Sequence, residues 1–212
     1  MRTRTVTRAG LRRPESNRRA AQPNVAALDL LIRANDGFIN RLALVQAHQW
    51  LAPTPCSAWD VRALVNHVVG ANRRYTMLLH GATAEDVDAT RAADHLGQDP
   101  VASFVATADE LNATLREPGA LARTTQHPAG ERTGLELLAT RVLDVAVHTW
   151  DLARAIGADE SLDSDVVAFA LTLRDTFEAG REFGSFARPP AESLTDFSAQ
   201  ARLLHLLGRQ PG

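Results

Sequence analysis

The sequence predicts an all-α protein, and three observations lead to this prediction. Apolar residues make up 45% of the chain but aromatic residues only 5%. The core must therefore be built mainly from Leu, Val and Ala, which favours helices over a β-sandwich. Apolar residues recur at helical spacing in six segments, and caps or helix breakers bound most of them. No segment indicates a β-strand, and the sequence contains no internal repeat.

Length and composition point to one soluble domain. At 212 residues the chain can bury a substantial core, but it is short for two domains. It has no run of about 18 apolar residues, which a membrane span requires, and no secretory segment follows Met1. The single cysteine excludes an internal disulfide and fits a reducing compartment. We therefore expect a cytoplasmic protein whose folded domain covers residues 24–212.

The first 23 residues have a different composition from the rest. They lack apolar periodicity, and seven arginines against one acid lie before Ala20, which predicts a disordered Arg-rich tail. No aromatic residue lies between these arginines, so the tail alone gives little support for a nucleic-acid-binding arm. We expect a solvated extension, with neither nucleic acid nor membrane as a partner. The chain contains no lysine, and all-Arg usage with many alanines suggests a GC-rich genome.

The first half of the domain predicts two helices. The first covers residues 25–46, with apolar residues near a 3.6-residue period and Gly37 as an internal weak point. Pro53 and Pro55 then interrupt the helical pattern. The second helix has Asp60 as its N-cap and an apolar stripe behind it, and it ends near His80, before a glycine.

The second half predicts four more helices. Residues 81–98 are polar and form a loop with room for a short helix. A third helix follows to residue 116, with Asp99 as N-cap and Pro100 at its first position. Residues 120–133 are irregular, and the fourth helix runs from Gly134 to Gly157, a C-cap glycine. A fifth helix over 163–179 and a terminal helix over 195–207 complete the chain.

The fourth helix carries the residues that indicate chemistry. It is apolar around most of its circumference, except for a narrow stripe of Arg141, Asp144, His148 and Asp151. Asp144 and His148 are four residues apart, so they lie one turn apart on the same face. A carboxylate and an imidazole in this arrangement can ligate one divalent metal, and His67 on the second helix offers a third ligand.

A simpler interpretation remains open for the same residues. The stripe could be the solvated face of the helix, with surface pairs worth less than about 1 kcal/mol each, and His67 could be a satisfied core residue. Bundle interiors do, however, build metal sites from inward carboxylates and histidines on facing helices. Two histidines and one carboxylate would leave coordination positions for water or substrate.

Two motifs then show a resemblance to a known family. The string TPCSAWDVRALVNHVVG, with Trp59 eight residues before His67, resembles the second helix of the DinB/YfiT-like metal-binding proteins. The nearest branch is the one related to the metal-binding N-terminal domain of mycothiol-dependent maleylpyruvate isomerase. The string DVAVHTWDLARAIG resembles that branch's fourth helix, and FGSFARPP and RLLHLLGRQP are similar to its C-terminal parts. The resemblance covers residues 25–210.

The resemblance implies a four-helix bundle in an up-down-down-up arrangement, with additional short C-terminal helices. His67, Asp144 and His148 match the family's three metal ligands, although the isomerase has Glu at the position of Asp144. The family usually binds Zn or another divalent ion, so we expect Zn here, with Ni or Fe as alternatives. Several relatives use a low-molecular-weight thiol, which is mycothiol in actinobacteria. The isomerase carries a further domain, and this chain has too few residues after Gly180 to supply it, which argues against maleylpyruvate isomerisation itself.

From this resemblance we expect a metal-binding, mycothiol-dependent transferase or isomerase. Its partners would be a small-molecule thiol and an electrophilic substrate, and the metal would hold the thiol as a thiolate. Asp151 is a candidate for orienting a ligand, and Trp150 and Arg141 are further candidates for substrate binding, although Trp150 fits packing better. Cys56 has no adjacent base in sequence and suits a small buried filler.

Two alternatives belong to other functional classes. One is a metal-dependent hydrolase that uses a metal-bound water. The other is a non-catalytic bundle with a structural or vestigial metal site, in which the helices form a homodimer or partner surface.

Overall fold

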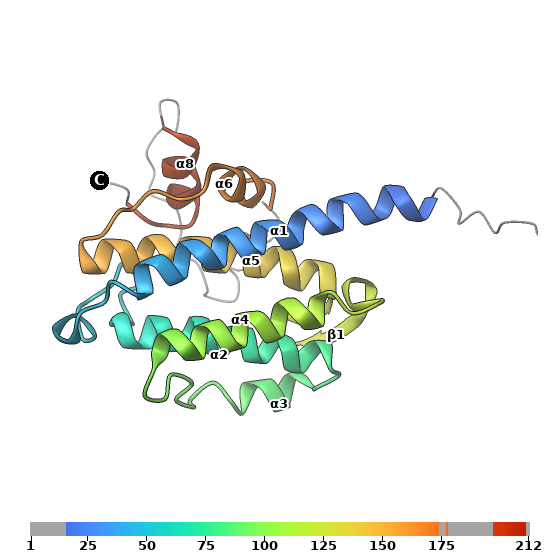
Figure 1. Ribbon diagram of the computed structural model, residues 1–212, viewed down its shortest axis with the longest axis horizontal. Helices are drawn as coiled ribbons and strands as arrows, with labels where there is room; N and C mark the ends of the chain where they lie inside the picture. Colours follow the sequence, from blue (N-terminus) through green and yellow to red (C-terminus); the bar gives the residue numbers. More distant parts are fainter. Residues whose placement is uncertain (1–15, 174–176, 178–196, 211–212) are drawn as a thin grey trace, which may run out of the picture.

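The computed structural model describes residues 16–173, 177 and 197–210. Four long helices form the bundle, namely α1 (Ser16–Leu42), α2 (Val61–Leu79), α4 (Pro100–Leu115) and α5 (Gly134–Ile156). In Figure 1, α1 and α5 run in one direction and α2 and α4 run in the opposite one. The described chain is mostly helical, and this up-down-down-up order confirms the predicted fold class.

The core lies between these four helices. Phe38 of α1 packs against Phe104 of α4, with ring centroids 4.8 Å apart. Gly37 lies where α1 packs on α5, and a Cβ at this position would make an ordinary van der Waals contact with Thr149 Cγ2 at 3.7 Å. The contact between the two helices therefore does not require glycine at residue 37.

The predicted caps are present. The Asp60 side chain accepts a hydrogen bond from the backbone N–H of Ala63, and Asp99 caps α4 through Ala102 with Pro100 as the first helical residue. Gly157 ends α5 in a left-handed conformation at φ 70°. These caps satisfy backbone groups that the helices leave free at their ends.

The segment before α5 contains two β-strands, so the expectation that the chain has no strand is wrong. Residues 120–133 form a short 3-10 helix, η2 (Ala120–Ala122), followed by an antiparallel hairpin of β1 (Thr124–His127) and β2 (Gly130–Thr133). The strands are four residues long and mostly polar, so they carry no apolar alternation that would reveal them. Gly134 begins α5 directly against η2, where a Cβ would lie 2.1 Å from the carbonyl oxygen of Ala120.

The remaining elements differ from the prediction mainly in their bounds. Helix α1 begins at Ser16 instead of residue 25, so residues 16–23 of the predicted tail are helical, and residues 1–15 lie outside the described chain. The short elements are η1 (Ala47–Gln49), α3 (Ala84–Asp88), α6 (Ser164–Ala170) and α8 (Ala199–Leu206). Helix α6 covers the first half of the predicted fifth helix. Most of the rest of that helix, the FGSFARPP motif and residues 195–196 lie outside the described residues.

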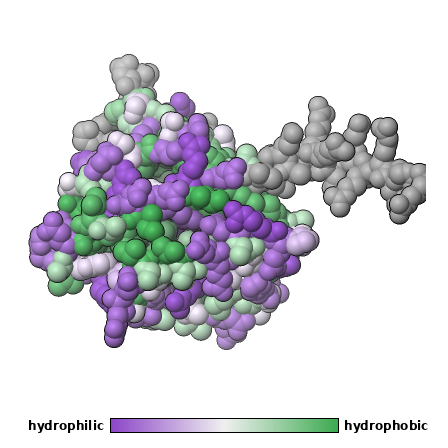
Figure 2. Space-filling model, in the orientation of Figure 1, coloured by the Kyte–Doolittle hydropathy of each residue, from purple (hydrophilic) through white to green (hydrophobic). Residues whose placement is uncertain are grey.

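Helices α6 and α8 pack on the outer side of α5, as Figure 1 shows. They form a second apolar cluster with Leu143 and Val147 of α5. On the face drawn in Figure 2, hydrophilic side chains surround a smaller apolar area. Within the described residues, no helix has both the length and the hydropathy needed to cross a membrane.

Candidate metal centre

Three side chains from two antiparallel helices converge between α2 and α5. The Nε2 atoms of His67 and His148 lie 3.4 and 3.3 Å from the same oxygen, Oδ1 of Asp144. The potential ligand atoms of the three residues all lie within 4.8 Å of one another. The structure thus brings together the three residues that the sequence analysis selected as metal ligands.

Arg141 fixes the carboxylate of this group. Its guanidinium is fully buried, and it donates to Asn72 Oδ1 and to the carbonyl oxygen of Val68, both at 2.8 Å. It also donates to Oδ2 of Asp144, the oxygen that faces away from the two histidines. Arg141 therefore lies at the site as predicted, but its hydrogen bonds hold Asp144 in place.

Asp151 holds His148 from the other side of the ring. Nδ1 of His148 lies 3.0 Å from Oδ2 of Asp151, whose side chain is fully buried. Arg209, just after α8, donates to both oxygens of Asp151 at 3.2 and 2.8 Å. Burial alone would raise the pKa of Asp151, but the hydrogen bonds from His148 and Arg209 outweigh it and lower the pKa to about 2. Asp151 is therefore ionised and fixes the ring orientation of His148.

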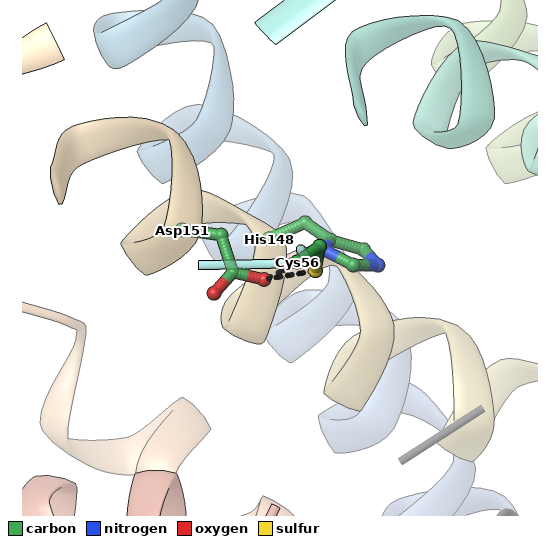
Figure 3. A group of neighbouring side chains, drawn as sticks. All are labelled: Cys56, His148 and Asp151. Atoms are coloured by element: carbon green, nitrogen blue, oxygen red, sulfur yellow. Dashed lines mark hydrogen bonds and ion pairs between the residues drawn. The ribbon is translucent and has the colours of Figure 1, made fainter. Parts of the chain in front are cut away.

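Cys56 joins this network, as Figure 3 shows together with His148 and Asp151. Its thiol donates to Oδ2 of Asp151 at 3.2 Å, and Arg209 Nη2 donates to its sulfur at 3.2 Å. Cys56, His148 and Asp151 are close enough to form a second group of metal-ligating atoms. The guanidinium of Arg209 already supplies the positive charge there, so the His67, Asp144 and His148 group is the better cation site.

The charges of the first group favour a cation at its centre. Burial opposes ionisation of Asp144, but the charges of His148 and His67 outweigh burial and hold the pKa of Asp144 well below its usual range. Burial likewise opposes protonation of His148, yet Asp144 raises the pKa of His148 well above its usual range. Burial lowers the pKa of His67. In the metal-free protein, Asp144 thus holds a proton on His148, and a metal ion could take the place of that positive charge.

The three candidate ligands differ in their exposure to solvent. The side chains of His67 and Asp144 are 27% and 19% exposed, whereas His148 is 7% exposed. The ring of Trp59 lies against both histidines, with centroids 4.5 Å from His67 and 5.6 Å from His148. The interpretation of the polar stripe as a solvated surface face is therefore wrong, because Arg141, His148 and Asp151 are buried and Asp144 is only 19% exposed.

One candidate lies outside the cluster, and two residues of the cluster have no signal in the sequence. Trp150 is 1% exposed and carries the guanidinium of Arg154 over its ring at 5.2 Å, which is a packing position. These two residues are Arg209, which no sequence pattern indicates, and Cys56, whose sequence position fits a packing role. They contact Asp151 across 58 and 95 positions of sequence, and no spacing motif signals contacts of that kind.

The comparisons with known proteins show which family the chain belongs to. Residues 31–153 match the family model described as the mycothiol maleylpyruvate isomerase N-terminal domain. The chain belongs to this family. The match to the mycothiol maleylpyruvate isomerase N-terminal domain contains the three candidate ligands together with Asp151, and it ends before Arg209.

The relatives do not assign an activity. Two proteins of Mycobacterium tuberculosis, both described as uncharacterised, are 33% identical over 176 residues, which is 78% of this chain and 92% of each relative. No solved structure matches the chain. The family match confirms the resemblance to the mycothiol maleylpyruvate isomerase branch that the sequence motifs indicated.

The residues present fit a divalent metal ion. Two imidazole nitrogens and one carboxylate oxygen converge from facing helices, a donor set that suits zinc and also other divalent transition metals. The second nitrogen of His148 is bound by a carboxylate, an arrangement that orients histidine ligands in many metal sites.

Proposed function

We propose that the protein binds one divalent metal ion through His67, Asp144 and His148 and uses a low-molecular-weight thiol to act on an electrophilic substrate. The observation that carries the metal half of this proposal is the convergence of three donor atoms with His148 fixed by Asp151. The thiol half is supported by membership of a family named for mycothiol maleylpyruvate isomerase. Zinc is the metal that we favour, with nickel and iron as alternatives, and transfer or isomerisation is the class of reaction.

The chain's own residues have defined tasks in this proposal. When bound at such a site, a divalent metal lowers the pKa of a coordinated thiol, so that the thiolate forms near neutral pH. Asp151 accepts the Nδ1 proton of His148, which leaves Nε2 available as a ligand. Arg141 keeps Oδ1 of Asp144 directed at the two histidines, and Trp59 covers one side of their rings. The free cysteine Cys56 also fits the cytoplasm as the place of action.

Elemental analysis tests the metal site directly. The wild type and His148→Ala should be purified without added metal and without a polyhistidine tag. We expect about one divalent ion per chain in the wild type, because two histidines and one carboxylate form a standard catalytic donor set, and loss of the metal in His148→Ala. A wild type that stays metal-free after dialysis against zinc and nickel would overturn the proposal.

Turnover assays then separate thiol-dependent chemistry from the alternatives. Thiol-dependent consumption of an electrophile supports the proposed reaction class. Hydrolysis of test esters or amides without thiol would instead assign a metal-dependent hydrolase. A metal shell closed by four protein ligands would indicate a structural site.

A further inference from the structure

Arg74 is a buried guanidinium beside the metal centre without an acidic partner. It lies on α2 seven residues, or two helical turns, after His67, and therefore on the same helix face. The residue is 8% exposed. Its one hydrogen bond within the described chain is a long one of 3.4 Å from Nη2 to the carbonyl oxygen of His67. No carboxylate of the described residues forms an ion pair with it.

The other two buried arginines near the site show that the lack of an acidic partner at Arg74 is unusual. Arg141 donates to Asn72, Val68 and Asp144, and Arg209 donates to Asp151 and Cys56. Burying a charged group is costly unless it is paired and hydrogen-bonded. Arg74 has no ionic partner among the described residues and only the long hydrogen bond to His67, so its position needs another explanation.

The backbone below Arg74 is shaped to hold it there. A Cβ at Gly70 would lie 2.7 Å from Nη1 of Arg74 and 2.5 Å from Cδ2 of His95, so any larger residue would displace at least one of these side chains. His95 is itself fixed, because its backbone N–H donates to Asn66 Oδ1 and its ring contacts the carbonyl oxygen of Thr90 at 3.0 Å. Gly70 and His95 thus form a cradle that keeps the Arg74 guanidinium against α2.

The charges around the metal centre leave Arg74 uncompensated. Burial lowers the pKa of Arg74, and the nearby Arg91 and Arg141 lower it further, while Asp144 opposes them. Asp144 is already bound by Arg141, and Asp151 by Arg209. A divalent metal bound by His67, Asp144 and His148 would replace the proton of His148 and so add one net positive charge, which a thiolate would neutralise. The charge of Arg74 would still lack an anion, so the occupied site has room for a further one.

We propose that Arg74 is the anion-binding residue of the metal centre and binds a carboxylate of the small molecule that occupies it. The inference rests on the proposed function, because it places this ligand at the same site. The carboxylate belongs either to the thiol or to the electrophilic substrate. Both sources present the same chemistry to the guanidinium, which is a planar fork suited to carboxylates.

The test compares ligands that differ only in charge. The cobalt(II)-loaded protein is titrated with mercaptoacetate, 3-mercaptopropionate and 4-mercaptobutyrate, each against its own primary amide, and thiolate binding is followed by the sulfur-to-cobalt absorption band. A second arm titrates thiol-free carboxylates, succinate and glutarate, against their diamides by calorimetry. The first arm detects a carboxylate on the thiol, and the second detects one on the substrate.

Three variants make the result specific to Arg74. Arg74→Gln removes the charge, Arg74→Lys keeps it, and Arg73→Gln is the matched control, because Arg73 is the exposed neighbour on α2. In at least one arm we expect the wild type and Arg73→Gln to prefer a carboxylate by about tenfold or more, the size of a charge-assisted hydrogen bond. The preference should disappear in Arg74→Gln, with amide affinity unchanged, and be partly retained in Arg74→Lys.

The outcomes separate this inference from the proposed function. If thiols bind but neither arm shows a preference that depends on Arg74, the inference is overturned and the metal centre stands. If no thiol changes the cobalt spectrum, the thiol half of the proposed function fails, and the calorimetric arm still decides the role of Arg74. Thermal unfolding provides a further criterion. If the role of Arg74 is purely structural, Arg74→Gln should have a lower melting temperature than the wild type. If Arg74 is an unpaired buried charge, the melting temperature of Arg74→Gln should be unchanged or higher.

Discussion

Asp151 makes more polar contacts than any ligand of the candidate metal centre. Its two oxygens accept hydrogen bonds from His148, Arg209 and Cys56, and the carboxylate is fully buried. Asp151 therefore orients the candidate ligand His148 and also compensates the buried positive charge of Arg209.

Replacing Asp151 with Asn should weaken both functions. Asparagine has the same shape, but it lacks the charge that holds the Nδ1 proton of His148, so metal affinity should fall about 10- to 100-fold. Arg209 would lose its buried partner, which typically costs about 3–5 kcal/mol of unfolding free energy. Chelator competition measures the first effect and chemical denaturation the second. Asp36→Asn is the control, because Asp36 is exposed and has no described polar partner. An Asp151→Asn protein with wild-type affinity would contradict the positioning role.

Residue patterns predicted the three candidate metal ligands but only part of the network that supports them. Asp144 and His148 stand four residues apart on one helix, and such spacing is visible in any sequence. Cys56 and Arg209 reach Asp151 only because the chain folds back on α5, and neither has a pattern around it that indicates this contact. Arg74 could have been noticed, since an arginine two turns after a candidate ligand lies on the same helix face.

At the scale of elements, local signals explain which segments were predictable. Asp60, Asp99 and Gly157 cap their helices through bonds to residues a few positions away, so the sequence contains both partners. The hairpin has no such signal. Its strands are short and mostly polar, and its position depends on packing against α2 and α5.

The hairpin should make stability sensitive to acid through His127, at the end of β1. The ring lies edge-on to Tyr75 with centroids 6.1 Å apart, and Nδ1 accepts a hydrogen bond from Ala129 N–H at 3.1 Å, which requires an unprotonated Nδ1. Burial, followed by Arg132 and Arg91, lowers the pKa of His127 to about 4. A histidine with a lowered folded-state pKa contributes stability that is present above its unfolded pKa near 6.5 and is lost as the pH falls toward 4.

The melting temperature of the wild type should therefore fall further between pH 7.5 and pH 5 than that of His127→Asn. Asparagine can accept the same backbone hydrogen bond without titrating. Other titratable groups are common to both proteins, so the difference between the two shifts isolates His127. Equal shifts in the melting temperatures of the two proteins would show that protonation of the His127 ring does not destabilise the folded hairpin.

At the scale of the whole molecule, the network around the candidate metal centre includes a residue beyond the family match. The match ends at residue 153, whereas Arg209 follows α8. The apolar cluster of α5, α6 and α8, which includes Leu203 and Leu207, keeps this end of the chain against α5. We infer that the C-terminal part stabilises the network around Asp151 and so supports His148.

A double-mutant cycle between Arg209→Met and Asp151→Asn tests this coupling. Each single variant leaves one buried group without its charged partner, so each should lose stability and metal affinity. The double variant removes both charges, and its loss of unfolding free energy should be smaller than the sum of the two single losses by about 1–3 kcal/mol, as for residues in one hydrogen-bonded network. Arg202→Met controls for the loss of an arginine from α8, because Arg202 is exposed. Strictly additive losses would mean that Arg209 stabilises the chain end independently of Asp151, and that the metal centre is complete within the matched region.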